Sequence, residues 1–513
     1  MVYAFPLPTT SPLSFQTYLS SSTHPSLPQS ASTARHALRL ALKRHKRLPP
    51  RERETHLQTV LNALNDYLPY LFAISHGLSG KSVGSSGGGG VGEEVEITLR
   101  AEIEVEWRPV LTSSSSLSLL KGMRDGGRIK GRGLDFEIAF VLGTLGYVLS
   151  GLARVGVLRT LYAASTPTTE QRTAAVQAAT KQLLQTSSVH SLLASSYSLA
   201  EGSSATAVPD FSSATQSALS SLALAEATLL AVLKDDAYTF ACIQARNPHD
   251  KEWMVRAPEI PKVRALLFAR LCVRAAEYAE QAAAGLGSVG AGGRNGSAAG
   301  KIDEDLVKYA QTLGKVARAK ACRFFGVDAE LAGKVGEGIA WLRAGKGALG
   351  FKRALAPEET TGKGGTISRL KREWAERREE RKLEKGNVGG GGGHNGELDR
   401  GDGAGWEEEC RVLDMLETKW VKMNNTVSTQ VIPPSASLLS NLPSGRDIHS
   451  APGPYTPPSL DEDQLVRMRA PPDEGEQQLP GLGENDDSDE EGSPGEPPGA
   501  FPSKPVTTDS TYF

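Results

Sequence analysis

Apolar residues recur at three- and four-residue spacing along most of the first 350 positions, which predicts a mostly helical chain. The first such segment runs from Thr33 to Phe72, and Pro49-Pro50 divides it into two helices. Further helices are predicted at Phe136–Leu152, Glu170–Leu193, Ala214–Lys234, Pro261–Ala284, Asp303–Phe325, Ala329–Leu349 and Trp406–Val421. Successive helices without intervening strands favour a bundle or a helical solenoid.

One segment follows the two-residue period of a β-strand. From Val95 to Trp107 every odd position is apolar and every even position is polar, so one face is expected to pack and the other to meet water. The run is longer than a typical strand, and we therefore expect a bend within it.

The most apolar run, Ile138–Ala153, is 16 residues without a charge. A helix that crosses a bilayer needs about 20 apolar residues, so a buried core helix is the better interpretation. The first fifteen residues lack a basic region followed by an apolar one, and no signal peptide is predicted.

Composition divides the chain into a domain, residues 1–445, and a tail, residues 446–513. Flexible loops are predicted at 77–92 and 285–300, and a charged, glycine-rich insertion at 357–405. The tail is rich in proline and acidic residues and is predicted to be disordered. It has 15 acidic and 4 basic residues, a charge of −11, which leaves +9 on the domain from the total of −2. A basic domain favours acidic partners or a membrane surface, and an ordinary solvated surface is the alternative.

No residue pattern predicts catalysis. Gly80–Gly84 fits G-x-S-x-G but lies in a glycine-rich loop rather than between a strand and a helix. The four cysteines form no C-x-x-C pair, and the nine histidines show no metal-ligand spacing, so no metal, cofactor or catalytic residue is predicted. His190 lies in an apolar helix and is expected to be a core residue.

Two charged segments bear on possible partners. The segment Ile367–Lys385 is interpreted as a solvated helix, and no nucleic-acid partner is expected. The basic residues between Lys121 and Arg132 suit anionic lipid or an acidic helix, or form a solvated loop.

Four segments in order resemble motifs of the BRO-domain family, to which ALIX belongs. They are Leu134–Gly146 (LDFEIAFVLGTLG), Leu222–Lys234 (LALAEATLLAVLK), Lys334–Leu342 (KVGEGIAWL) and Lys422–Pro433 (KMNNTVSTQVIP). The resemblance spans about residues 1–443. The family has Asn, Arg and Tyr where this chain has Gly143, Trp341 and Ser428.

The resemblance implies an elongated, curved helical domain with a tetratricopeptide-like core and a small N-terminal β-sheet. It also implies a non-enzymatic scaffold that binds the C-terminal helix of an ESCRT-III filament subunit through exposed aliphatic anchors. By motif position the partner-binding candidates are Leu219, Leu222, Lys234, Leu342 and Leu349. Core packing is the alternative for each leucine, and a solvated surface position is the alternative for Lys234.

The start FPLPTT and the acidic tail are similar to those of the fungal pH-response regulators within this family. That similarity implies a role in ambient alkaline pH signalling that leads to proteolytic activation of a transcription factor. It also implies other pathway components as partners, and a cytoplasmic chain recruited to plasma or endosomal membrane, with peripheral membrane association. A generic helical solenoid adaptor for another peptide is the alternative.

Overall fold

The computed structural model describes residues 2–84, 92–112, 127–163, 167–195, 208–244, 264–289, 300–351, 403–450 and 452–471. Residues up to Arg469 form one compact unit, and the chain from Ala470 onward is a separate unit. The charged segment 367–385, most of the insertion and the tail beyond residue 471 lie outside the described residues.

The first unit is built mainly from long helices. They are α1 (Leu27–Arg47), α2 (Pro50–Leu78), α4 (Leu134–Leu161), α5 (Thr169–Ser195), α6 (Ser213–Leu233), α7 (Ala237–Gln244), α8 (Ala265–Ser288), α9 (Glu304–Leu331), α10 (Val335–Ala348), α12 (Trp406–Met423), α13 (Ser435–Ser440) and α14 (Glu462–Met468). The helices predicted within the described residues are therefore confirmed, including the break before Pro50, except that α9 continues past the predicted start of the next helix at Ala329 and α10 begins only at Val335. The eight-residue α7 was not predicted.

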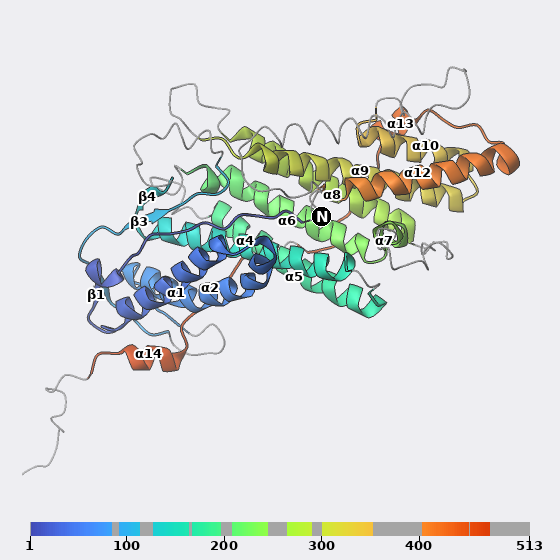
Figure 1. Cartoon of the computed structure of the whole chain (residues 1–513). Coiled ribbons are helices and arrows are strands. Elements are labelled where there is room, and N and C mark those ends of the chain that lie inside the picture. The colour runs from blue at the N-terminus through green and yellow to red at the C-terminus, as the bar shows by residue number, and fades with distance from the viewer. Residues whose placement is uncertain are drawn as a thin grey trace, which may run out of the picture. The chain divides into compact units, whose positions relative to one another are not determined.

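Successive helices are spatial neighbours, as Figure 1 shows. α1 pairs with α2, and α2 packs on α4. The series then continues through α5, α6, α8, α9 and α10, and α12 packs against α7, α9 and α10. This order along the chain is what short connections between antiparallel helices produce.

Two short antiparallel strand pairs lie in the N-terminal region. β1 (Leu19–Ser21) pairs with β2 (Ile97–Leu99), and β3 (Glu104–Trp107) pairs with β4 (Ile129–Arg132). The single predicted strand is thus divided after Leu99, and its two parts pair with different segments. The predicted fold class, mostly helical with small N-terminal strand pairs, is confirmed.

Helix α4 lies in the core. Its Leu142 and Leu145 are buried, as predicted. A Cβ at Gly143 would lie 2.7 Å from the Phe211 ring, so any larger residue here would have to displace that ring. By length and composition α4 and α6 are both apolar enough to cross a membrane, but their most apolar stretches are 83% and 78% buried inside the unit.

The described residues after 445 are ordered, although the sequence predicted that disorder would start at residue 446. Their backbone crosses α8 and α5: Arg446 N–H donates to the Arg270 carbonyl (3.1 Å), and the Ser188 hydroxyl donates to the Gly453 carbonyl (2.9 Å). α14 and the residues just before it bury apolar side chains in the N-terminal core, namely Leu460, Leu465 and Met468. The disorder prediction is therefore wrong for these described residues, because apolar side chains within an acidic stretch still pack.

Candidate partner-binding site

The predicted site centres on α6, which lies between α5 and α8 (Figure 1). The Ser212 side chain caps the helix by accepting a hydrogen bond from Thr215 N–H (3.2 Å). Alanine and leucine make up more than half of the helix, which favours helix formation. Because apolar residues occur on all sides of α6, it is suited to burial rather than to one exposed face.

The four predicted leucine anchors are core residues. Leu219 and Leu222 on α6 pack with residues of α8 and α9, and both are no more than 2% exposed. Leu342 on α10 and Leu349 after it pack against α12. The exposed-anchor prediction is thus wrong for these leucines in this structure, and the core alternative holds.

A narrow outer stripe of α6 does reach solvent. Ser217 is exposed, and Leu224 and Ala231 are half-buried. The seven-residue spacing of these positions puts them on one face of the helix. The sequence analysis did not predict this stripe. Ser217, the polar residue among the three positions, was the signal in the sequence that this side of α6 faces outward.

Lys234 follows the last turn of α6 and is half-buried. Its ammonium has no ion pair or hydrogen bond within the described residues, while the neighbouring Asp235 pairs with Arg264 at 3.3 Å. A cation at the end of an apolar stripe suits an amphipathic helix that carries a carboxylate.

A buried cluster of four charges fixes the elements beyond the end of α6. Arg323 on α9 binds Asp236, which precedes α7, through two hydrogen bonds of 2.5 and 3.1 Å. Arg323 Nε also donates to Glu409 of α12 (2.7 Å), and Lys320 donates to the same carboxylate (2.9 Å). Although burial alone would raise the pKa of Asp236, the charges of Arg323 and Lys320 lower it well below its usual value.

A second buried cluster surrounds Glu137 of α4. Its carboxylate accepts hydrogen bonds from Arg35 Nε (2.7 Å), the Tyr67 hydroxyl (3.0 Å) and the Trp107 indole (2.7 Å). Arg35 also donates to the Ser11 carbonyl (2.8 Å). The cluster therefore joins α1, α2, α4, β3 and the N-terminal segment.

Glu226, within the fourth turn of α6, anchors the N-terminal segment. It accepts hydrogen bonds from the Tyr3 backbone N–H (2.9 Å) and the Tyr309 hydroxyl (2.8 Å). Burial raises the pKa of Glu226 to about 7, and these two donors oppose the rise. Its protonation therefore changes near neutral pH.

The structure places three of the cysteines and His190 in or against the core. Burial raises the pKa of the Cys242 thiol to about 11 and those of Cys272 and Cys322 to about 12, which disfavours thiolate nucleophiles. No group of three potential metal ligands occurs within the described ranges. His190 is buried, and its Nδ1 lies 2.7 Å from the Gln216 side-chain oxygen, as expected of a core histidine.

Comparison with known proteins decides the family. No family model matches the chain. The pH-response regulator protein palC of Emericella nidulans is 60% identical over 521 aligned residues, which cover all of both chains. The chain belongs to the palC family of pH-response regulators. The palC protein of Cryptococcus neoformans is 29% identical over 163 residues, which cover 31% of this chain and 28% of its own.

Solved structures agree on the fold of this palC-family chain. The ALIX BRO1 domain in complex with CHMP4C matches with a TM-score of 0.51 and 15% identity, over 89% of this chain and 96% of its own. ALIX in complex with a SIVmac239 late-domain peptide also has a TM-score of 0.51, with 14% identity over 92% of this chain and 52% of its own. The fold is therefore that of the BRO1 domain.

Proposed function

We propose that this chain is a non-enzymatic adaptor that binds the C-terminal helix of an ESCRT-III filament subunit during ambient alkaline pH signalling. Binding would help to assemble the complex in which a transcription factor is activated by proteolysis. The full-length similarity to a pH-response regulator is the observation that carries the signalling role.

The BRO1 fold supports the choice of partner. The similar ALIX domain was solved in complex with CHMP4C, so a fold of this kind accommodates such a ligand. The outer stripe of α6 offers the matching chemistry, with Leu224 and Ala231 as apolar contacts and Lys234 as the cation. An amphipathic helix with an aliphatic face and a flanking carboxylate fits this surface.

The adaptor role also agrees with the way in which the buried charged residues are paired. The buried clusters around Arg323 and Glu137 are internally paired, and neither is placed to react with a substrate. We infer that the chain acts from the cytoplasm and is recruited to plasma or endosomal membrane, where other pathway components join it.

Calorimetric titration of the full chain with a synthetic ESCRT-III C-terminal helix tests the proposal. We expect saturable binding by the wild type and a loss of at least about tenfold for Leu224→Asp, because burying an unpaired carboxylate opposes an apolar contact. Lys234→Gln should weaken binding less, since an ion pair that is partly open to solvent contributes little.

Two variants control for folding and for nonspecific charge effects. Leu222→Asp should unfold the domain, whereas Leu224→Asp should keep a cooperative thermal transition, and circular dichroism separates these outcomes. Leu40→Asp adds a carboxylate to a leucine that is 49% exposed on α1 and should leave peptide affinity unchanged. If folded wild-type chain binds no ESCRT-III helix, the partner assignment is wrong and an adaptor for another peptide takes its place.

A further inference from the structure

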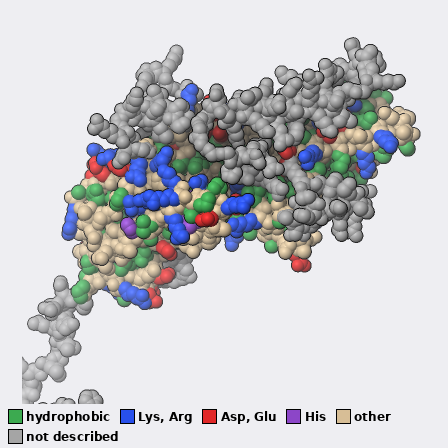
Figure 2. Space-filling model, in the orientation of Figure 1, with side chains coloured by type: hydrophobic (Ala, Val, Ile, Leu, Met, Phe, Trp, Pro, Cys, Tyr) green, Lys and Arg blue, Asp and Glu red, His purple; other side chains and the backbone are tan. Residues whose placement is uncertain are grey.

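The outer face of α1 carries a concentrated positive charge. Arg39, Lys43, Lys46 and Arg47 share one side of the helix through their three- and four-residue spacing. Figure 2 shows Lys and Arg side chains gathered over this part of the molecule. We call these four residues, together with Arg108 and Arg128, the α1 basic surface.

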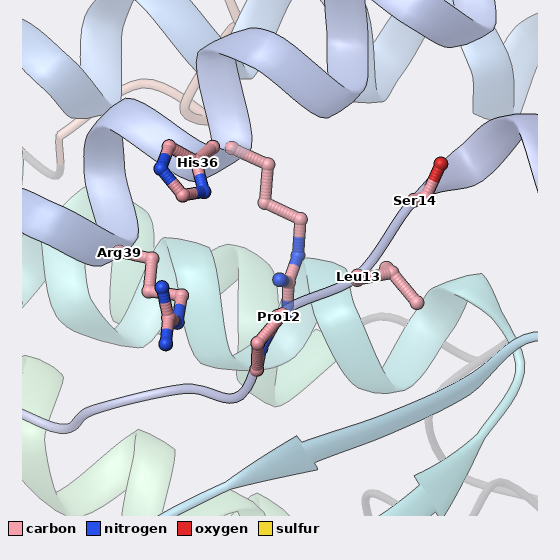
Figure 3. Close-up of a pocket in the computed structure, with 6 residues that line it drawn as sticks. Pro12, Leu13, Ser14, His36 and Arg39 are labelled. Carbon is pink, nitrogen blue, oxygen red and sulfur yellow. The ribbon is translucent and has the colours of Figure 1, made fainter.

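The α1 basic surface is concave. A hollow of about 270 Å³ is lined by Thr9, Thr10, Arg39, Lys43, Lys46, Arg47 and Arg128. A second hollow, of about 210 Å³, shares Arg39 with it and is bounded by His36 and the segment Pro12–Ser14. Figure 3 shows His36 and Arg39 on α1 facing that segment. The wall is fixed, because Arg35 donates hydrogen bonds to Thr10 and Ser11 from beneath it.

The cations of this surface are not neutralised by the described part of the chain. None of the residues lining either hollow is acidic, and none of the six basic residues forms an ion pair within the described ranges. By contrast, the nearby Lys130 pairs with Glu106 at 3.4 Å. Burial lowers the pKa of Lys46, and the charges of Arg108 and Arg128 lower it further. The positive charges therefore repel one another in the absence of an anion.

Favourable interaction with the dipole of α1 explains only some of the basic residues of this surface. Cations in the last turn of α1, including Lys46 and Arg47, interact favourably with the helix dipole. That effect falls off within one turn, so it does not explain Arg39. It also does not explain Arg108 and Arg128, which come from other segments.

An exposed leucine indicates which kind of anionic ligand suits the α1 basic surface. Leu40 lies on α1 between Arg39 and Lys43 and is 49% exposed. An apolar side chain flanked by cations is typical of surfaces that enter the interfacial region of a membrane. Single-stranded nucleic acid would instead require aromatic platforms for stacking, and neither hollow is lined by an aromatic ring of Phe, Tyr or Trp.

We propose that the α1 basic surface binds the clustered phosphates of a multiply phosphorylated lipid headgroup, with Leu40 entering the membrane interface beside it. Arg39, Lys43, Lys46 and Arg128 surround the phosphates in the larger hollow, and the Thr9–Thr10 segment forms its wall. This site lies on α1 rather than α6, so it is independent of the proposed ESCRT-III contact.

Vesicle co-sedimentation of the full chain tests the site. The probes are phosphatidylcholine vesicles, vesicles with phosphatidylserine, and vesicles of equal total charge with phosphatidylinositol bisphosphate. We expect the bisphosphate vesicles to bind most tightly. Each basic residue near an anionic surface contributes about fivefold, so Lys43→Gln with Lys46→Gln should lose about thirtyfold. The matched control, Lys130→Gln, removes a paired cation and should lose little.

A soluble headgroup distinguishes the two sources of phosphate. Inositol hexakisphosphate should compete with the vesicles, whereas Leu40→Ser, which removes the apolar side chain without adding a charge, should weaken vesicle binding and leave hexakisphosphate binding unchanged. Equal effects of Leu40→Ser on both ligands would mean a soluble phosphate ligand and overturn the lipid assignment. The site itself would be wrong if the folded variant with both Lys43→Gln and Lys46→Gln kept wild-type affinity for the vesicles. It would also be wrong if the wild type bound duplex DNA more tightly than bisphosphate vesicles.

Discussion

Two regions of the molecule bury charge in different ways. The N-terminal core holds one carboxylate, Glu137, between one guanidinium and two neutral donors, Tyr67 and Trp107. The C-terminal core holds two carboxylates and two cations, with Arg323 at the centre. Each arrangement joins elements that are distant in sequence: the first joins the N-terminal segment to α4, and the second joins α7, α9 and α12.

The difference predicts how each region responds to the loss of one partner. In the N-terminal core, removal of Arg35 leaves Glu137 with two hydrogen-bond donors. In the C-terminal core, removal of Arg323 leaves Asp236 and Glu409 with a single cation, Lys320. Breaking a buried ion pair is costly because the remaining charge stays out of water. Each removal leaves one negative charge uncompensated, but loss of Arg323 breaks ion pairs with two carboxylates, whereas loss of Arg35 breaks a pair with one.

The largest effect is expected for Arg323→Met. The variant should lose about 3–5 kcal/mol of unfolding free energy, since two carboxylates then share one ammonium. Chemical denaturation measures the change. The matched control is Arg318→Met on the same helix, which breaks a surface pair with Glu280 and should cost no more than about 1 kcal/mol. Equal losses in the two variants would contradict the comparison.

Arg35→Met should cost less, about 3 kcal/mol, because Tyr67 and Trp107 still donate to Glu137. Adding Glu137→Gln should restore part of the stability by removing the uncompensated charge. Denaturation of the single and double variants gives the coupling between the two positions. A double variant less stable than the single one would show that the charge of Glu137 is not the source of the loss.

The pH dependence of stability sharpens the comparison at Glu226, a carboxylate whose pKa is raised by burial although two hydrogen-bond donors and the charge of Arg154 oppose the rise. Its pKa of about 7 when folded lies above the ordinary glutamate pKa of 4.5, so the folded chain retains a proton that the unfolded chain releases. The protonated Glu226 adds about 3 kcal/mol to the free energy of unfolding. This stabilisation is complete below pH 4.5 and is lost as pH rises through about 7.

Glu226→Gln stays neutral and keeps the acceptor oxygen, so it should remove this slope between about pH 5 and 8. Melting temperatures across this range measure the effect, with Glu280→Gln as an exposed control. An unchanged slope in Glu226→Gln would assign the pH dependence to another group.

The smallest effect tests whether C-terminal residues complete the N-terminal core. Leu465→Ala on α14 should cost about 2 kcal/mol, because a buried leucine leaves a cavity. Val466→Ala, at a side chain that is 49% exposed, should change stability by less than about 0.5 kcal/mol. The same thermal shift in both variants would mean that α14 does not pack as described.

Sequence periodicity predicted the long helices because their apolar spacing is local. It did not predict β1, because a three-residue strand is defined by its pairing with β2, more than 70 positions away. It also missed α14, because the acidic and proline-rich composition of the whole tail concealed the apolar positions Leu460, Leu465 and Met468.

The site was harder to predict than the fold. On α6, leucine or alanine occupies nearly every position after Ser221, so the pattern does not tell an outward Leu224 from an inward Leu222. The motif resemblance identified the correct helix but not the exposed side of it. The α1 basic surface depends on Arg108 and Arg128 meeting α1, which only the tertiary structure brings together.

The central claim is that this chain contributes to pH signalling by binding rather than by catalysis, and a cellular measurement tests it most directly. The chain is replaced by its Leu224→Asp variant, and the fraction of proteolytically processed transcription factor is measured after a shift to alkaline medium. With the variant folded and present at wild-type level, the account predicts a marked loss of processing. Full processing by cells that carry this variant would contradict it.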